Sequence, residues 1–422
     1  MVPTMKPNYE SVSEELSPKA RVVEEANDYG LINNLSNLLD ILPDLTMSKI
    51  LLTGATGYVG GTVLAQLIAS TAPSIKDLTF DLLIRDETQA QKLKTVYGSR
   101  VNTIKWSGLE DVAFIEDTAS NYDIIINTGS GFIPGGAIAF VNGLARGIDA
   151  GKPAPWILHI SGCTNLSDRP ISQPRRPIRE WNDETDKGKI FSFMRALDEM
   201  EPYTQRTTEV GVLEAADATG VQAISINTPC IFGEGSGLFN RQGLVIPLIM
   251  MYVVQHGYGW KLNETANFDW VHVIDLADIY VLLVRKILER EDRGVGYLPS
   301  GKNGVIFAAV GRTLIKDINQ GCLDAAFADG TLPREGTPKQ KEIRSVPLHE
   351  IADKLTAGRR DIAERGWGGH KATKAVLARK LLGWKPKRQQ DAWEADFQAE
   401  LIALKENRRM VTMESCIGAT KK

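Results

Sequence analysis

Three evenly spaced glycines give the clearest sign of chemistry in this chain. Gly54, Gly57 and Gly60 form a GxxGxxG pattern between an apolar segment, 50–52, and a longer apolar segment, 61–70. In a strand–turn–helix unit Gly54 permits the tight turn, Gly57 lets the backbone approach a pyrophosphate, and Gly60 allows close packing. The helix N-terminus then offers free N–H groups to phosphate. A turn without a ligand is the alternative, but the pattern predicts a dinucleotide site at Gly54, Thr56, Gly57, Tyr58, Val59 and Gly60.

The end of the second expected strand selects the dinucleotide. An acidic side chain at this position binds the ribose hydroxyls of NAD, whereas an arginine favours the 2′-phosphate of NADP. This chain has Arg85 followed by Asp86. Arg85 therefore predicts NADP, while Asp86 leaves NAD open. In the alternative interpretation both residues are solvated and open a helix, with Asp86 as its N-cap.

These residues must be positioned by the elements around them, and from Lys49 onward expected strands alternate with expected helices. The strands are continuously apolar, which is typical of strands that are buried on both faces of a parallel sheet. The predicted fold is therefore α/β, a Rossmann-type doubly wound parallel sheet with a smaller C-terminal substrate-binding subdomain. After the first strand, the other strands are expected at 78–84, 101–106, 122–130, 156–161 and 221–229.

Composition shifts along the chain predict four parts. Residues 1–46 are expected to form a weakly ordered extension with one helix, and 47–235 the Rossmann domain. Residues 236–407 are expected to be mostly the substrate-binding subdomain, with 266–290 returning to the Rossmann part, and 408–422 a loose tail. Within the subdomain we expect a buried helix at the apolar run 244–254 and two C-terminal helices separated by Pro386.

Composition excludes several classes of protein. The chain has 422 residues, and its 49 basic and 52 acidic side chains leave no positive excess for binding nucleic acid or an anionic membrane. Its longest apolar run has 11 residues, fewer than the roughly 20 of a spanning helix. The four cysteines are far apart and form no CxxC pair, so we expect no metal site and a reducing, cytoplasmic location. Common hydrolase, zinc-protease and P-loop motifs are absent.

Several segments resemble the extended and atypical short-chain dehydrogenase/reductase superfamily, near its NAD-dependent epimerase and NmrA-like branches. The resemblance covers about 47–404 and implies a Rossmann domain followed by a smaller substrate-binding part. Some of the segments look like those of fungal uncharacterised NAD(P)-binding proteins within that superfamily. The segments that carry the resemblance are 53–61 (TGATGYVGG), 126–131 (INTGSG), 159–162 (HISG), 203–215 (YTQRTTEVGVLEA), 226–237 (INTPCIFGEGSG), 237–247 (GLFNRQGLVIP), 269–280 (DWVHVIDLADIY) and 378–384 (ARKLLGW).

The resemblance implies a catalytic tyrosine, with a lysine four residues later that lowers its pKa. Tyr203 matches the tyrosine, but residue 207 is threonine, and no tyrosine in the sequence has a lysine at that spacing. A tyrosine titrates near pH 10 without such help. Arg206 lies three residues after Tyr203, on the same side of a helix, so its charge is predicted to lower the phenol pKa. The alternative is a capping Tyr203 and a solvated Arg206.

Other polar residues lie at the ends of expected strands. By the resemblance, Ser161 or Thr164 holds the substrate oxygen, although both could simply close a turn. The resemblance also places Thr228 and Pro229 beside the nicotinamide. We further expect the adenosine and ribose to be bordered by the residues that end the fourth strand, Asn127, Thr128 and Gly129.

The leading interpretation is an NAD(P)-dependent oxidoreductase that transfers hydride to or from a carbonyl or secondary alcohol of a small molecule, such as a secondary metabolite or sugar nucleotide. One alternative is a non-catalytic, NmrA-like regulator that binds the dinucleotide, which the missing lysine favours. Another is a non-redox isomerase, cyclase or epimerase on the same scaffold. The expected partners are a small molecule and, as one form of assembly, a second copy of the chain.

Overall fold

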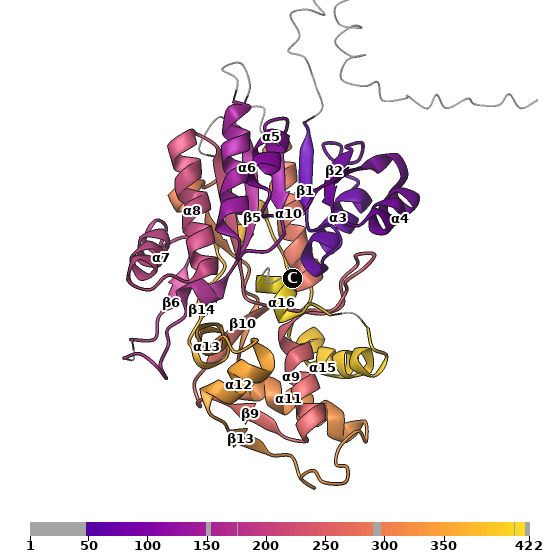
Figure 1. Cartoon of the computed structure of the whole chain (residues 1–422), viewed down its shortest axis with the longest axis vertical. Helices are drawn as coiled ribbons and strands as arrows, with labels where there is room; N and C mark the ends of the chain where they lie inside the picture. Colours follow the sequence, from indigo (N-terminus) through magenta and orange to yellow (C-terminus); the bar gives the residue numbers. More distant parts are fainter. Residues whose placement is uncertain (1–47, 149–152, 175, 290–296, 409, 418–422) are drawn as a thin grey trace, which may run out of the picture. The chain divides into compact units, whose positions relative to one another are not determined.

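A seven-stranded parallel sheet is the largest sheet in the described residues (Figure 1). The computed structural model describes residues 48–148, 153–174, 176–289, 297–408 and 410–417, so the helix expected before residue 47 lies outside the described residues. The strand order reverses beside β1, which creates the crevice where ligands bind in doubly wound sheets. In spatial order the strands are β11 (Val305–Phe307), β7 (Gln222–Thr228), β5 (Trp156–Gly162), β4 (Ile124–Asn127), β1 (Ile50–Thr53), β2 (Phe80–Ile84) and β3 (Val101–Lys105).

Helices cover both faces of this sheet, which confirms the predicted fold class (Figure 1). On one face lie α5 (Val112–Ala119), α6 (Pro134–Arg146) and α8 (Thr204–Thr219). On the other lie α3 (Tyr58–Ala69) and α10 (Val273–Leu288). The helices beside these layers are α4 (Glu87–Tyr97), α7 (Lys189–Met200) and α14 (Leu377–Leu382), and 3-10 turns occur at Gly98–Arg100, Cys163–Leu166 and Gly301–Asn303.

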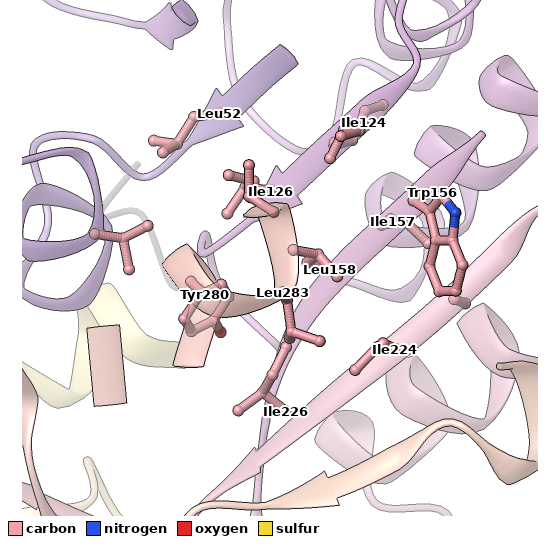
Figure 2. Close-up of a cluster of buried hydrophobic side chains, with 14 of the residues drawn as sticks. Leu52, Ile124, Ile126, Trp156, Ile157, Leu158, Ile224, Ile226, Tyr280 and Leu283 are labelled. Carbon is pink, nitrogen blue, oxygen red and sulfur yellow. The ribbon is translucent and has the colours of Figure 1, made fainter. Parts of the chain in front are cut away.

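The two faces of the sheet differ in polarity near the carboxyl ends of the strands. An apolar row that includes Leu52, Ile126 and Leu158 lies toward Tyr280 and Leu283 of α10 (Figure 2). The residues one position later point to the opposite face, since side chains alternate along a strand. That second row is polar and buried, and it consists of Thr53, Asn127, His159 and Ser225.

A second hydrophobic core lies in the C-terminal half, where several tryptophans are buried. Its helices are α9 (Val245–His256), α11 (Ile315–Ala328), α12 (Leu348–Leu355), α13 (Arg360–Ala363) and α15 (Gln390–Lys405), with a π-helical turn at Glu364–Gly368. Short strands form three small sheets: β8 (Cys230–Phe232), β10 (Asn267–His272) and β12 (Gly311–Leu314); β9 (Gly259–Lys261) with β13 (Ile343–Ser345); and β6 (Glu180–Asn182) with β14 (Ala372–Lys374).

Several local predictions for this half are confirmed. The apolar run forms the buried helix α9, and α14 and α15 lie on either side of Pro386. The expectation of a loose tail is wrong for Met413–Ile417, which forms a short helix, α16. Strand β11 joins the central sheet, although its residues lie outside the ranges predicted for the Rossmann domain. No helix in the described part of the chain has both the length and the apolar character needed to cross a membrane.

Candidate functional site

A cavity of about 420 Å³ lies at the carboxyl ends of β1, β4, β5 and β7. Its walls come from segments far apart in sequence, which the parallel sheet brings to one edge. This is the crevice at which the strand order reverses. The cavity brings together many of the residues predicted from sequence, namely Gly54, Thr56, Gly57, Tyr58, Val59, Arg85, Thr128, Gly129, Ser161, Thr228 and Pro229.

The glycine turn has the geometry that a phosphate site needs. Gly54 has a φ of +79°, and a Cβ there would lie 2.5 Å from the carbonyl oxygen of Thr128. A Cβ on Gly60 would overlap the same turn, although Gly60 itself does not line the cavity. Helix α3 begins after Gly57 with no side-chain cap and no acidic residue in its first turn. Its first N–H groups therefore remain available to an anion.

The two residues that follow β2 have different roles. Arg85 is exposed and lines the cavity. Asp86 is the N-cap of α4, and its Oδ1 accepts a hydrogen bond of 2.8 Å from the backbone N–H of Gln89. The capping alternative therefore holds for Asp86, and Arg85 is the charged side chain from this turn that lines the cavity.

Asn127 does not line the cavity, but it contacts a residue that does. Its buried Oδ1 accepts hydrogen bonds from the Thr53 hydroxyl (2.9 Å) and from the Gly129 N–H (3.3 Å). Its Nδ2 lies 3.1 Å from His159 Nδ1, and burial lowers the pKa of His159 to about 4. Asn127 thus positions the backbone of Gly129, which does line the cavity.

Tyr203 is buried and is not among the residues that line the cavity. Its hydroxyl donates to Thr164 Oγ1 (3.3 Å), and that hydroxyl in turn donates to Gln205 Oε1 (2.5 Å). Gln205 is the side chain of α8 that lines the cavity. Burial raises the pKa of Tyr203 to about 12, and the Thr164 hydroxyl and the Arg365 charge oppose this only in part. The phenol therefore stays protonated at neutral pH and is not available there as a general base.

The predicted pairing of Arg206 with Tyr203 needs correction. Arg206 is buried, and its guanidinium donates to Asp198 and to the backbone carbonyls of Asn165, Leu197 and Glu201. Its centre lies 5.9 Å from the Tyr203 ring, farther than that of Arg365, at 4.5 Å. Arg206 therefore ties α8 to the end of α7 and does not reach the cavity.

Ser161 connects the cavity to a buried carboxyl group. Its Oγ donates a hydrogen bond of 2.9 Å to Glu209 Oε2. Glu209 lies on α8 and has no exposed surface. Our sequence reasoning missed Glu209. A usable signal was present, because a carboxylate at this position shares a helix face with the apolar Val212, Leu213 and Ala216.

The C-terminal segment also forms part of the cavity wall, which was not expected. Met410, Val411, Thr412 and Cys416 line the cavity. The hydroxyl of Ser130 donates to the Cys416 carbonyl at 2.7 Å.

We expect removal of the residues after 408 to raise the Kd for the dinucleotide predicted from the sequence about tenfold, because this wall shields a bound ligand from solvent. Fluorescence titration of the truncated chain would measure the change. Ser130→Ala removes only the hydrogen bond to the segment and should have a smaller effect. Tighter binding after truncation would instead show that the segment competes with the ligand.

No family model matches this chain. Among curated proteins it is similar to oxidase ucsJ of an Acremonium species, with 23% identity over 349 residues, which cover 80% of this chain and 92% of that protein. An uncharacterised protein of Saccharomyces cerevisiae is 23% identical over 279 residues, which cover 64% of this chain and 80% of that protein.

Two solved structures are similar to this chain over most of its length. The dTDP-glucose 4,6-dehydratase DesIV from Streptomyces venezuelae, with NAD and TYD bound, has a TM-score of 0.55 and 13% identity over 85% of this chain and 97% of its own. The chain has the fold of the extended short-chain dehydrogenases/reductases. A UDP-glucuronic acid 4-epimerase from Bacillus cereus, with NAD and UDP-glucuronic acid, shares this extended short-chain dehydrogenase/reductase fold, with a TM-score of 0.52 and 13% identity over 85% and 99%. The resemblance inferred from sequence is thus confirmed at the level of the fold.

Proposed function

We propose that the chain binds a nicotinamide dinucleotide, with NADP preferred, and transfers hydride to or from a carbonyl or secondary alcohol of a small molecule. The observation that carries this proposal is the cavity at the reversal point of the sheet, with an uncapped helix N-terminus on one side. A Cβ at Gly54 would collide with the Thr128 carbonyl, so a glycine is needed for the tight turn that precedes this helix N-terminus. The similarity to solved structures that hold NAD supports the same ligand.

Each wall of the cavity has a part in this proposal. The N–H groups at the start of α3 hold the pyrophosphate, and Arg85 pairs with the 2′-phosphate. Thr128 and Gly129 border the ribose, while Thr228 and Pro229 lie against the nicotinamide. Ser161 holds the oxygen of the substrate. The bound dinucleotide supplies the hydride chemistry, and the protein supplies placement and proton handling.

We expect Arg85→Ala to raise the Kd for NADPH tenfold or more, because a charge-assisted hydrogen bond contributes about 1.5–3 kcal/mol. The Kd for NADH should change little, since NADH has no 2′-phosphate. Fluorescence titration of both dinucleotides measures the two effects. Lys94→Ala is a charge-matched control, because Lys94 is exposed in the last turn of α4, does not line the cavity and should leave the ratio of the two Kd values unchanged. An equal loss of affinity for NADPH and NADH in Arg85→Ala would contradict the assignment of Arg85 to the 2′-phosphate.

Turnover tests the chemistry. With NADPH and a panel of aldehydes and ketones, or with NADP⁺ and secondary alcohols, we expect a change in nicotinamide absorbance that depends on the second substrate. Binding without any turnover would favour the second candidate, a regulator or a non-redox isomerase. The burial of Tyr203 and the threonine at position 207 favour that second candidate. A cytoplasmic location and a homodimer remain predictions.

A further inference from the structure

Glu209 is a buried carboxyl group surrounded by hydrogen-bond donors. Its Oε1 accepts from Ser225 Oγ (2.6 Å) and Asn227 Nδ2 (3.2 Å). Its Oε2 accepts from Ser161 Oγ (2.9 Å), Asn165 Nδ2 (2.5 Å) and Asn227 Nδ2 (3.0 Å). None of these partners is a cation. Because both oxygens accept throughout, these hydrogen bonds stabilise the carboxylate form.

Ser161 is the one member of this set that also lines the cavity. Its Oγ accepts from Asn165 Nδ2 (3.0 Å) while it donates to Glu209, so the orientation of the hydroxyl is fixed. The Thr228 hydroxyl donates to the Ser161 carbonyl (2.7 Å) and holds the backbone at the same place. A hydroxyl held between a cavity and a carboxylate can accept one proton as it gives up another.

We propose that Glu209 exchanges protons with the reacting oxygen of the substrate through Ser161. This inference rests on the proposed function. In alcohol oxidation the substrate O–H proton passes to Ser161 Oγ, and the Ser161 proton passes to Glu209. A nicotinamide dinucleotide held at the start of α3 would supply the hydride acceptor that balances this oxidation of the alcohol to a carbonyl. Carbonyl reduction runs the same transfers in reverse. Ser161 is then catalytic, and Glu209 is a positioning residue that stores the proton.

The surroundings of Glu209 suit this role better than those of Tyr203. Burial raises the pKa of Glu209 from its ordinary range, although the hydrogen bonds oppose the shift, so proton uptake moves toward neutral pH. The other titratable groups near the Glu209 carboxyl are His159, which pairs with Ser225 across the sheet, and Cys163. Burial lowers the pKa of His159 and raises that of Cys163, so both are neutral near pH 7. Neither competes with Glu209 for a proton there.

Infrared spectroscopy tests the relay without a substrate or a dinucleotide. In the full chain, we expect a carboxylic acid C=O band that disappears as pH rises and that Glu209→Gln removes. After transfer to D₂O the band should shift quickly, because Ser161 connects the buried proton to the cavity. Ser161→Ala should slow this shift by about tenfold or more, since exchange then requires local opening of the fold. Ser161→Thr keeps a hydroxyl and should restore fast exchange.

Ser225→Ala is the matched control, because it removes a hydrogen bond to the same carboxyl but does not touch the cavity. It should raise the pKa of the band and leave its exchange fast. If Glu209→Gln does not fold, the shift in Ser225→Ala assigns the band instead. Equal exchange rates in Ser161→Ala and the wild type, or no band that responds to these variants, would overturn the relay. NADPH titration reports on the dinucleotide site independently, so the two proposals can fail separately.

Discussion

Gly54→Ala is expected to weaken NADPH binding on the order of 100-fold, equivalent to about 3 kcal/mol. The methyl group would lie 2.5 Å from the Thr128 carbonyl oxygen, and the φ of +79° is unfavourable for any residue with a Cβ. The turn must therefore move, and with it the N–H groups that face the phosphates. Titration of NADPH fluorescence measures the loss.

Gly135→Ala is the matched control for this variant. Gly135 lies in the first turn of α6, where a Cβ would meet only a Val112 methyl group at an ordinary 3.7 Å. The control should bind NADPH like the wild type, and thermal unfolding of both variants separates a local change in the turn from a loss of fold. Unchanged affinity in a folded Gly54→Ala protein would show that the turn does not hold the ligand.

The stability of the chain is expected to fall as pH rises from about 4 to about 8, because of two buried carboxyl groups on α15. Asp396 and Glu400 lie one helical turn apart and are both nearly inaccessible to solvent. Burial raises the pKa of Asp396 to about 7. Burial, with the charge of Asp396, raises the pKa of Glu400 to about 8. The two groups titrate as a pair.

Stability falls with rising pH because the folded state holds these protons at pH values where the unfolded chain has lost them. Their stabilising contribution is complete below about pH 4, and it disappears above about pH 8. Glu400→Gln should therefore increase the free energy of unfolding at pH 9 by about 2 kcal/mol and flatten its pH dependence. Glu394→Gln, an exposed change on the same helix, should not. Denaturant unfolding at pH 5 and pH 9 measures both, and the same slope with pH in Glu400→Gln and the wild type would contradict this account.

This pair also connects the second core to the candidate site. Asp396 accepts a hydrogen bond from the Gly233 N–H (3.3 Å), and the Tyr58 hydroxyl donates to the Gly233 carbonyl (2.5 Å). Tyr58 is the first residue of α3, whose N-terminus forms the proposed phosphate site. We therefore expect ionisation of Asp396 to affect the position of Tyr58 at the proposed phosphate site.

Local sequence patterns carried enough information to predict the sheet and the tight glycine turn. Strands such as Ile124–Asn127 are apolar throughout, and the glycine spacing has direct steric meaning, as the geometry of Gly54 shows. These features depend on neighbours in the chain. Most of the predicted residues that line the cavity follow strand ends, and a parallel sheet gathers such ends at one edge.

The residues that were missed depend on distant contacts. Glu209 becomes significant only because its hydrogen-bond donors come from other elements, among them Ser161 and Asn227 on neighbouring strands. The C-terminal segment reaches the cavity through Ser130, which is 286 residues earlier in the chain. The sequence places Glu209 on an apolar helix face, but it reveals neither the donors around Glu209 nor the contact of the C-terminal segment with Ser130.

Tyr203 matches the catalytic tyrosine of the resembled family in sequence, but it does not line the cavity. It is the N-cap of α8, so its side chain packs into the second core, where Phe132 contacts it edge to face at 5.9 Å. Thr207, four residues later, donates to Asp198 of α7 at 2.8 Å. The two positions thus take part in packing between helices.

Titration of the purified full chain with NADPH and NADH tests the central claim most directly. The account predicts saturable quenching of protein fluorescence by both dinucleotides, with a Kd at least tenfold lower for NADPH because Arg85 lines the cavity. Absence of saturable binding of either dinucleotide would contradict the claim that the cavity at the ends of β1 and β4 is a nicotinamide dinucleotide site.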